Sequence, residues 1–312
     1  MLLMATSRNF MKTLLILLLC FSWIKAQCPS DPKTIEPCQC TSSLPGQEEL
    51  VCNGPIGLVR LTTVLRNEMC GRTIGKFKLT LSDIEYLPSN LFFKIIVRDI
   101  QISFTYISHF TKAGRSAFFG LEPYLQSLSM RRGKLVDDLD WQKIGDLHAL
   151  TYLDLSFNNI TRIPLDWFDH PPPNLLSLIL KGNKIKTLES GSLSHMHELI
   201  ELDLSDNQIH SVTRNFFSWP GNAMIFLRLN DNQIKTLPMD IFDEMMGLRR
   251  IYLDNNQLES IPEELWSPIW TDLEILDLRG NPLNCNSTSV DWIAALRPPL
   301  HLYGSCQMHL VH

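Results

Sequence analysis

The sequence predicts an α/β solenoid of about nine repeats with disulfide-bonded caps at both ends. One apolar template returns six times, at spacings of 24 or 25 residues. After Cys20, five cysteines lie before residue 71 and two after residue 284, so crosslinks are confined to the ends. Stacked repeats bury a continuous core, but the terminal repeats need covers, and this combination therefore predicts a capped array.

Residues 1–26 are predicted to be a signal peptide. Arg8 and Lys12 precede the apolar run Leu14 to Phe21, and Ala26 offers a small residue for cleavage. This layout is typical of secretion. A membrane anchor is the alternative, but a span needs roughly 20 apolar residues and this run is shorter. We expect a secreted, extracellular protein without a membrane span.

The composition is that of an ordinary globular protein. Apolar residues make up 45%, and 28 Lys+Arg face 33 Asp+Glu, which gives a formal net charge of −5. Nucleic-acid-binding proteins carry a basic excess, so nucleic acid is not expected as a partner.

Residues 74–283 are predicted to form the repeat array. The template is L-x-x-L-x-L-x-x-N-x-L, which is the leucine-rich-repeat signature. Three weaker copies, at 74–84, 97–107 and 125–135, place Ser82, Thr105 and Gly133 in the Asn column. The six regular copies are LTYLDLSFNNI (150–160), LLSLILKGNKI (175–185), LIELDLSDNQI (199–209), MIFLRLNDNQI (224–234), LRRIYLDNNQL (248–258) and LEILDLRGNPL (273–283).

The template predicts where its side chains lie. Alternate strand residues point to opposite faces, so the leucines face the core and the residues between them face solvent. Parallel pairing of successive strands then gives a horseshoe with a concave sheet. The Asn amide follows the strand, where it can satisfy backbone groups that would otherwise be buried unpaired. Because Gly133 lacks a side chain, we expect the third repeat to be the least regular.

A second apolar signal recurs in the outer half of five repeats. One aromatic residue per repeat aligns there, and its regular placement favours core packing over a ligand-binding stripe. These residues are Phe92, Phe168, Phe217, Phe242 and Trp266.

Residues 27–73 are predicted to form an N-terminal cysteine cap. The spacing of Cys28, Cys38, Cys40 and Cys52 by itself leaves three connectivities open. The cluster resembles the cysteine cap of extracellular leucine-rich-repeat proteins, which implies that Cys28 pairs with Cys40 and Cys38 with Cys52. Cys70 is left over, and we expect a buried free thiol rather than a bond to another chain.

Residues 284–312 are predicted to form a shortened C-terminal cap. The stretch "NPLNCN…VDWIAAL…C" resembles the family's C-terminal cap, with Cys285 and Trp292 at its motif positions. It departs at Asn286, where the cap often has a second cysteine. The resemblance implies a Cys285–Cys306 disulfide. Two glycosylation sequons, at Asn159 and Asn286, fit a secreted protein.

The repeats, caps and signal together cover nearly the whole chain. They resemble secreted leucine-rich-repeat proteins, a group that includes small proteoglycans, Slit-like modules and Toll ectodomains. The start "CPSDPKTIEPCQCTSS" and the stretch "AFFGLEPYLQSL" are similar to an arthropod group that includes the non-catalytic subunit of the Oplophorus luciferin monooxygenase. That resemblance implies a non-enzymatic partner subunit.

The sequence contains no recognisable active site. It has no G-x-S-x-G, H-E-x-x-H, P-loop or Rossmann glycine pattern. His195 and His197 lack a convergent third metal ligand. Asp154, Asp203 and Asp277 recur at a solvent-facing strand position, but intervening repeats separate them, so paired acid–base chemistry lacks its geometry. We expect no enzyme activity, catalytic residue, metal or cofactor.

The solvent-facing residues of the concave strands are the candidate binding surface. Aromatic residues and Arg are typical of binding hot spots, and rigid solenoids present this face to partners. The sequence therefore predicts an extracellular protein partner; a subunit role beside a secreted oxidative enzyme and a carbohydrate- or pathogen-pattern-binding role in innate defence are the alternatives. The predicted binding residues are Tyr152, Asp154, Ile179, Glu201, Asp203, Phe226, Arg228, Arg250 and Tyr252.

Overall fold

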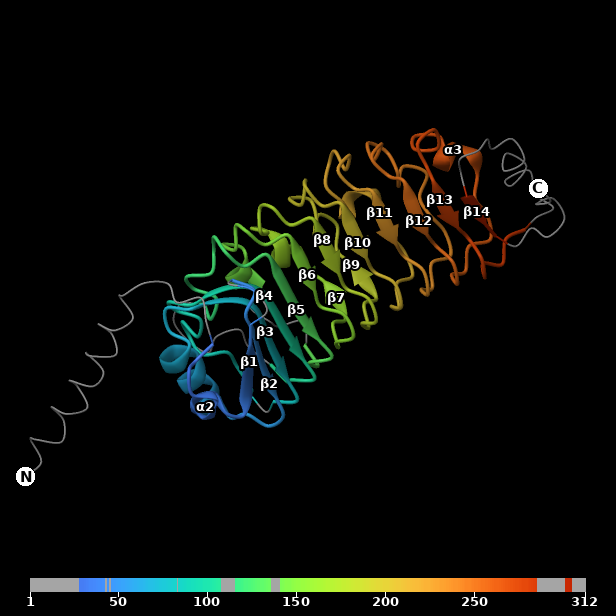
Figure 1. Cartoon of the computed structure of the whole chain (residues 1–312). Coiled ribbons are helices and arrows are strands. Elements are labelled where there is room, and N and C mark those ends of the chain that lie inside the picture. The colour runs from blue at the N-terminus through green and yellow to red at the C-terminus, as the bar shows by residue number, and fades with distance from the viewer. Residues whose placement is uncertain are drawn as a thin grey trace, which may run out of the picture. The chain divides into compact units, whose positions relative to one another are not determined.

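Repeated strand–turn units build the chain into a β-solenoid of about nine turns with a parallel sheet (Figure 1). The structure is a computed structural model that describes residues 28–42, 44, 46–82, 84–107, 116–135, 141–284 and 301–304. It contains two compact units, Met1–Ser129 with Leu147–Leu150 and Met130–Asp146 with Thr151–His312. The predicted fold class is confirmed.

The first unit is built from long strands. β1 runs antiparallel to β2, whereas β2, β3 and β4 pair in parallel. β3 and β4 stay in register from Thr73 opposite Ile96 to Thr80 opposite Ser103. The strands are β1 (Cys38–Thr41), β2 (Glu49–Asn53), β3 (Thr73–Thr80), β4 (Ile96–Ser103) and β5 (Ser127–Arg131), the last of which ends in the second unit.

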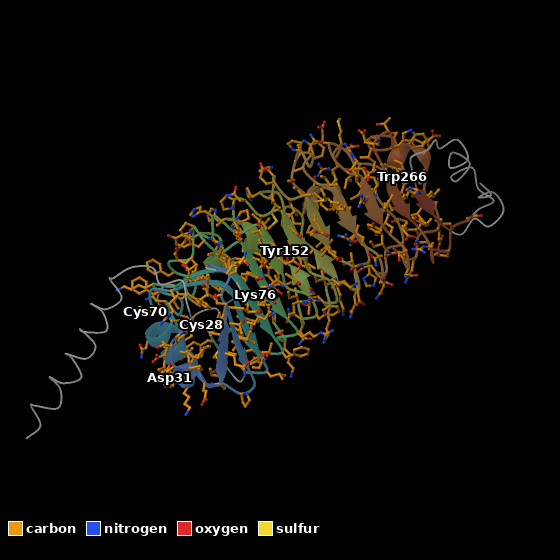
Figure 2. All side chains as sticks on the ribbon, viewed as in Figure 1. Cys28, Asp31, Cys70, Lys76, Tyr152 and Trp266 are labelled. Atoms are coloured by element: carbon orange, nitrogen blue, oxygen red, sulfur yellow. A yellow bond between two sulfur atoms is a disulfide. The ribbon has the colours of Figure 1, made fainter. Side chains whose placement is uncertain are left out.

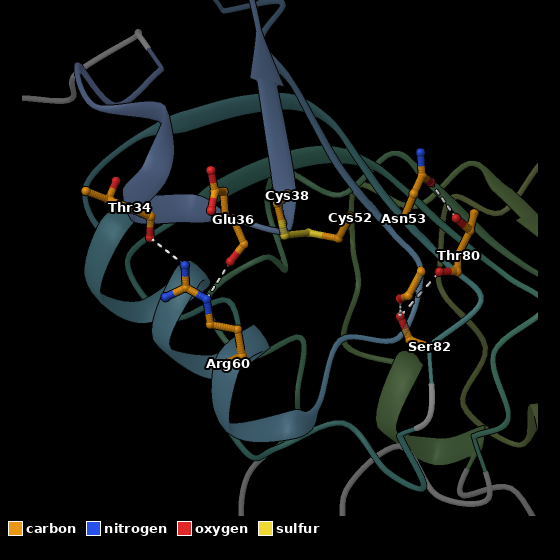
Figure 3. The surroundings of a disulfide bond; sticks show 9 residues. Thr34, Glu36, Cys38, Cys52, Asn53, Arg60, Thr80 and Ser82 are labelled. Carbon is orange, nitrogen blue, oxygen red and sulfur yellow. Dashed lines mark hydrogen bonds between the residues drawn. A yellow bond between two sulfur atoms is a disulfide. The ribbon is translucent and has the colours of Figure 1, made fainter.

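Two disulfides hold the N-terminal cap together. Cys28 bonds Cys40, and Cys38 bonds Cys52 across β1 and β2 (Figure 3). These are the pairings that the family resemblance implies. The cap also contains the 3-10 helix η1 (Pro32–Ile35), the helix α2 (Leu58–Thr63) and the π-helical turn η2 (Val64–Glu68).

Arg60 ties α2 to the chain that precedes β1. Its Nε donates to the carbonyl oxygen of Glu36 at 2.6 Å, and its Nη2 donates to that of Thr34 at 3.0 Å (Figure 3). Leu61, on the same helix, is completely buried. The helix is therefore held by both its apolar and its polar side chains.

The structure corrects the expectation for Cys70. Its sulfur is in a disulfide whose partner lies outside the described residues. The residue is only half-buried. The hydrophobicity of cysteine favours burial, but a partly accessible thiol can also be oxidised when a second cysteine comes within reach.

The second unit uses much shorter strands. Each pairs in parallel with the next, and Figure 1 shows their arrows side by side with a common direction. The strands are β6 (Tyr152–Asp154), β8 (Ser177–Ile179), β10 (Glu201–Asp203), β11 (Phe226–Arg228), β12 (Arg250–Tyr252), β13 (Ile275–Asp277) and β14 (His301–Tyr303).

A left-handed residue follows the strand in all nine repeats, always one position before the Asn column. Leu81, Phe104 and Phe157 adopt φ of 55°, 51° and 57° there, although bulky side chains rarely do so. The conformation is therefore imposed by the turn of the solenoid. The remaining residues at this position are Arg132, Gly182, Asp206, Asp231, Asn255 and Gly280.

The Asn column forms the predicted buried ladder. Nδ2 of Asn207 donates to the carbonyl oxygens of Leu180 at 3.1 Å and Leu204 at 3.0 Å, and its Oδ1 accepts from the Ile185 amide at 3.0 Å. One side chain thus satisfies buried backbone groups of two adjacent turns. The same pattern recurs at Asn158, Asn183, Asn232, Asn256 and Asn281.

Short helices and the small β7–β9 pair occupy the outer half of the repeats in the second unit. The aromatic residues aligned by the sequence, Phe92 of the first unit and Phe168, Phe217, Phe242 and Trp266 of the second, are all at most 2% exposed, so their assignment to the core is confirmed. The elements are η3 (Trp141–Ile144), β7 (Arg162–Ile163), η4 (Leu165–Phe168), β9 (Thr187–Leu188), η5 (Arg214–Phe216) and α3 (Glu263–Trp266).

The C-terminal cap is described only in part. β14 adds to the sheet beside β13, an element that the sequence pattern did not predict. Cys285, Asn286 and Cys306 lie outside the described residues, so their disulfide and glycosylation stay predictions.

Candidate functional site

The outward residues of β6, β8 and β10–β13 form one surface, which we call the strand face. Parallel register places Tyr152, Ser177, Glu201, Phe226, Arg250 and Ile275 in one column. A second column contains Asp154, Ile179, Asp203, Arg228, Tyr252 and Asp277. The structure therefore brings together all nine predicted binding residues. Figure 2 marks Tyr152 at the start of β6.

Two arginines and two aromatic rings form a cluster on β11 and β12. The Arg228 guanidinium carbon lies 5.8 Å from the ring centre of Phe226 and 5.4 Å from that of Tyr252. Arg250 lies 5.2 Å from the Phe226 ring centre. All four side chains are half-buried. Cation–π contacts at partly desolvated sites are favourable by about 0.5–2 kcal/mol each.

Carboxylates fix both arginines from the sides. Arg228 forms an ion pair with Glu201, whose other oxygen accepts a hydrogen bond of 2.8 Å from Ser177. Arg250 donates from Nε to Glu274 at 3.2 Å. Arg228 is thus held by two rings and one carboxylate, and Arg250 by one ring and one carboxylate. The rotamers are restrained before any partner arrives, which lowers the entropy lost on binding.

The aspartates of the second column are not open to solvent, contrary to the sequence-based expectation. Asp154 is 4% exposed and Asp203 is 8% exposed. Each accepts hydrogen bonds from the serine two residues later, Ser156 or Ser205, through both the backbone amide, at 2.9 Å, and the hydroxyl. Asp277 likewise accepts hydrogen bonds from the backbone amide and the guanidinium of Arg279, two residues later. These carboxylates hold the turn after the strand.

Tyr152 borders the buried Asp154. Burial is the main cause that raises the pKa of its phenol to about 12, and the Asp154 charge adds to it. The phenol hydroxyl donates to Asp154 Oδ2 at 3.5 Å, and Arg131 approaches the same oxygen at 3.4 Å. Tyr152 therefore presents a neutral ring at physiological pH.

Other chemistry-bearing groups do not converge within the described part of the chain. No group of three or more His, Cys, Asp or Glu there could hold a metal ion. His195 and His197 are exposed, while Met196 between them is buried. No helix of the described residues is long and apolar enough to cross a bilayer.

A comparison with protein-family models identifies the same repeats as the Asn ladder. The leucine-rich-repeat model matches residues 123–173, 148–209 and 226–283. These residues form leucine-rich repeats. A search of curated protein sequences found no match.

Solved structures share this leucine-rich-repeat fold at low sequence identity. A chain of the octameric complex of latrophilin 3, Unc5D and the leucine-rich-repeat protein FLRT2 matches at 22% identity and TM-score 0.58, covering 77% of this chain and 78% of that one. The Toll–Spätzle complex of Drosophila matches at 20% and 0.59, with 78% and 35% covered. An internalin from Listeria monocytogenes matches at 19% and 0.54, with 80% and 64% covered.

Sequence reasoning missed three partners of the strand face. Glu274 contacts Arg250, Arg131 contacts Asp154, and Ser177 contacts Glu201. Ser177 lies in the first column, but its small side chain gave it little weight as a contact residue. Glu274 lies one residue before its strand, so reading a third column one position earlier in the template would have found it.

Proposed function

We propose that this leucine-rich-repeat protein is secreted and recognises an extracellular protein through the strand face. The cluster of Phe226, Arg228, Arg250 and Tyr252 carries this proposal, because it combines the residue types of hot spots with half-burial and restrained rotamers. The signal-like residues 1–26 and the cap disulfides support an oxidising, extracellular location.

The size of the strand face suits one side of a protein interface. β6, β8, β10, β11 and β12 are successive strands, and neighbours in a sheet lie about 4.8 Å apart. The five strands thus span about 20 Å, comparable with one side of a modest interface. Tyr152 and Ile179 extend the cluster at the β6 end.

The charge that we expect on the partner surface differs from the one that the sequence alone favours. From the sequence, Asp154, Glu201 and Asp203 together favour a partner with a basic rim. Two of these carboxylates are buried in turn hydrogen bonds, and Glu201 pairs with Arg228. The strand face therefore offers balanced charge pairs around aromatic rings, which suits a partner surface with an apolar centre and few charges.

Similar folds occur in protein complexes. The Toll–Spätzle and latrophilin 3–Unc5D–FLRT2 structures are both described as complexes. At such low identity these structures indicate only that the fold is shared. Our proposal that this chain recognises a protein rests on its own side chains.

A non-catalytic subunit role is the second candidate. It rests on the resemblance of the N-terminal "CPSDPKTIEPCQCTSS" to the luciferin-monooxygenase subunit group. In that case the partner is a secreted oxidative enzyme, recovered in a fixed stoichiometry. A carbohydrate- or pathogen-pattern-binding role is the third candidate, and retention on a polysaccharide without a protein partner would favour it.

The test compares two double variants in affinity capture from extracellular fluid. Phe226→Ala with Tyr252→Ala removes the cluster rings and should weaken partner binding by at least ~2 kcal/mol. Phe104→Ala with Tyr106→Ala removes the same residue types from an exposed turn of the first unit and serves as the matched control.

The captured protein is identified by mass spectrometry, and its affinity for each variant is then measured by calorimetry. A partner that the control retains and the Phe226/Tyr252 variant loses supports the strand face. Equal binding by wild type and the Phe226/Tyr252 variant would place the functional surface elsewhere.

A further inference from the structure

One edge of the second unit carries a concentration of positive charge, most of which lies outside the strand face. These cations lie on or beside the turns of the third, fourth and fifth repeats, and we call this surface the basic edge. Its residues are Arg131, Arg132, Lys134, Arg162, Lys181, Lys184 and Lys186. The whole chain has a net charge of −5, so the local charge runs against the overall balance.

Backbone hydrogen bonds fix how these turns are stacked. The Asn159 amide donates to Leu135 at 2.9 Å, and the Lys184 amide donates to Ile160 at 2.9 Å. Lys134, Asn159 and Lys184 therefore occupy the same position of successive turns. Arg131, Arg132 and Lys134 of the third repeat form one row of cations, and Lys181, Lys184 and Lys186 of the fifth form a second. Two strand spacings, or about 10 Å, separate these rows.

An aromatic ring fills the space between the rows. The guanidinium carbons of Arg131 and Arg132 lie 5.6 and 5.0 Å from the ring centre of Phe157. On the other side lies Gly182, where an added Cβ would come within 2.4 Å of a ring atom. The ring is thus held between two guanidinium groups and a glycine that leaves room for it. The basic edge is therefore a shaped surface rather than a set of scattered lysines.

Most of the lysine charge is not neutralised within the described residues. Arg131 pairs with Asp154, and Arg162 pairs with Glu189 at 3.6 Å. Lys134, Lys181, Lys184 and Lys186 have no carboxylate within 4.0 Å in the described part of the chain. The acidic residues Asp137, Asp138 and Asp140 follow in the sequence but lie outside the described residues.

The same edge changes sign farther along the unit. The left-handed turn positions of the sixth and seventh repeats carry Asp206 and Asp231. In the eighth repeat, Asp254 directly precedes the left-handed residue Asn255. The concentration of positive charge is therefore limited to three adjacent repeats, although Lys235 occupies the position of Lys186 in the seventh repeat. A ligand that follows this edge must be anionic over about 10 Å, the distance between the two rows of cations.

We propose that the basic edge binds a sulfated polysaccharide. Lysine ammonium groups are compact, strongly hydrated point charges, which suits dispersed sulfate groups better than bidentate recognition. The two rows of cations, one from the third repeat and one from the fifth, match an extended chain with repeated anionic groups. A secreted protein, as proposed above, meets such chains outside the cell. Apart from Arg131, which pairs with Asp154, the basic edge and the strand face use different residues, so one can fail without the other.

Binding of the full-length secreted protein to heparin is the test, at about 0.15 M ionic strength and over a salt series. Lys184→Gln with Lys186→Gln should weaken binding about tenfold and lower the slope of log affinity against log salt by roughly two. The matched control, Lys33→Gln with Arg98→Gln, removes two exposed cations of the first unit and should bind like wild type. Each protein is measured both with the sequon intact and with Asn159→Gln, because a glycan on Asn159 would lie between Lys134 and Lys184.

Three results would overturn the proposal. The first is equal heparin affinity for the Lys184/Lys186 variant and its control. The second is equally tight binding of wild type to single-stranded DNA or anionic vesicles, which would indicate general attraction to polyanions. The third is loss of self-association in the Lys184/Lys186 variant without loss of heparin binding, which would assign the edge to a second copy of the chain. The Phe226/Tyr252 variant should retain heparin binding, which separates this proposal from the function proposed above.

Discussion

The two units differ in strand length and in the side chain that hydrogen-bonds the buried backbone groups of the turn after each strand. In the first, β3 and β4 pair over eight residues, and the turn that follows each is held by a hydroxyl, from Ser82 or Thr105. In the second, β6, β8 and β10 to β13 have only three residues each, and an Asn amide follows each of these strands. Disulfides are described at the start of the first unit.

The number of hydrogen bonds explains the difference. Ser82 Oγ donates at 3.2 Å to Gly54, with a longer contact of 3.4 Å to Thr80. The Asn207 amide donates to three carbonyl oxygens and accepts from one amide. Both groups can accept a hydrogen bond, but a hydroxyl has one donor, whereas an amide has two. Short strands are therefore sufficient where the amide ladder completes the pairing.

The largest stability effect should come from the cap. Replacing Cys38 and Cys52 by Ser opens a crosslink between residues 14 apart, and should cost about 2–4 kcal/mol in the free energy of unfolding. Hydrogen exchange should accelerate first in β1 and β2. Exchange that accelerates equally in β11 and β12 would contradict local stabilisation by the cap.

The next largest effect should come from the ladder. Asn207→Ala leaves carbonyl groups of Leu180 and Leu204 and the Ile185 amide without their partner, which should cost about 1–3 kcal/mol. Denaturant unfolding, followed together with exchange of the neighbouring amides, measures it. An unchanged midpoint would refute the buried ladder.

The corresponding change in the first unit should be smaller. Ser82→Ala removes one hydroxyl donor, which Gly54 and, at longer distance, Thr80 share, and the adjacent eight-residue strands remain. We therefore expect a cost of about 0.5–1.5 kcal/mol in the free energy of unfolding. The same unfolding experiment applies. A loss larger than that of Asn207→Ala would reverse the proposed contrast between hydroxyl and amide turns.

The smallest effect concerns Asp254. Burial, and secondarily the Asp277 charge, raises the pKa of the Asp254 carboxyl above 3.8. The folded state therefore binds this proton more tightly than the unfolded state, and stability falls as pH rises through the interval between the two pKa values. Asp254→Asn should raise the unfolding midpoint slightly at pH 7 and lose this advantage in acid.

Glu259→Gln is the control for Asp254, because that side chain is exposed and the change also removes one negative charge. It should leave the midpoint nearly unchanged at both pH values. A stabilisation by Asp254→Asn that persists in acid would show a cause other than the carboxylate charge.

The sequence by itself determined the repeat phase, and with it most of the fold. The leucine spacing placed Leu202 inward and Glu201 outward on the same strand, because side chains alternate with a period of two. It also assigned Phe242 and Trp266 to the core and placed the Asn ladder. These features repeat locally, so a single template contains their physical cause.

Only the tertiary structure decided how the outward residues are used. Asp154 and Asp203 lie at outward positions, yet the following serines and neighbouring strands enclose them. Arg228 meets Tyr252 from the next turn, 24 residues later in the sequence, and the oxidation of Cys70 likewise depends on a distant cysteine. The local pattern fixes the direction of a side chain, but its exposure and its partners depend on adjacent turns whose residues the template leaves free.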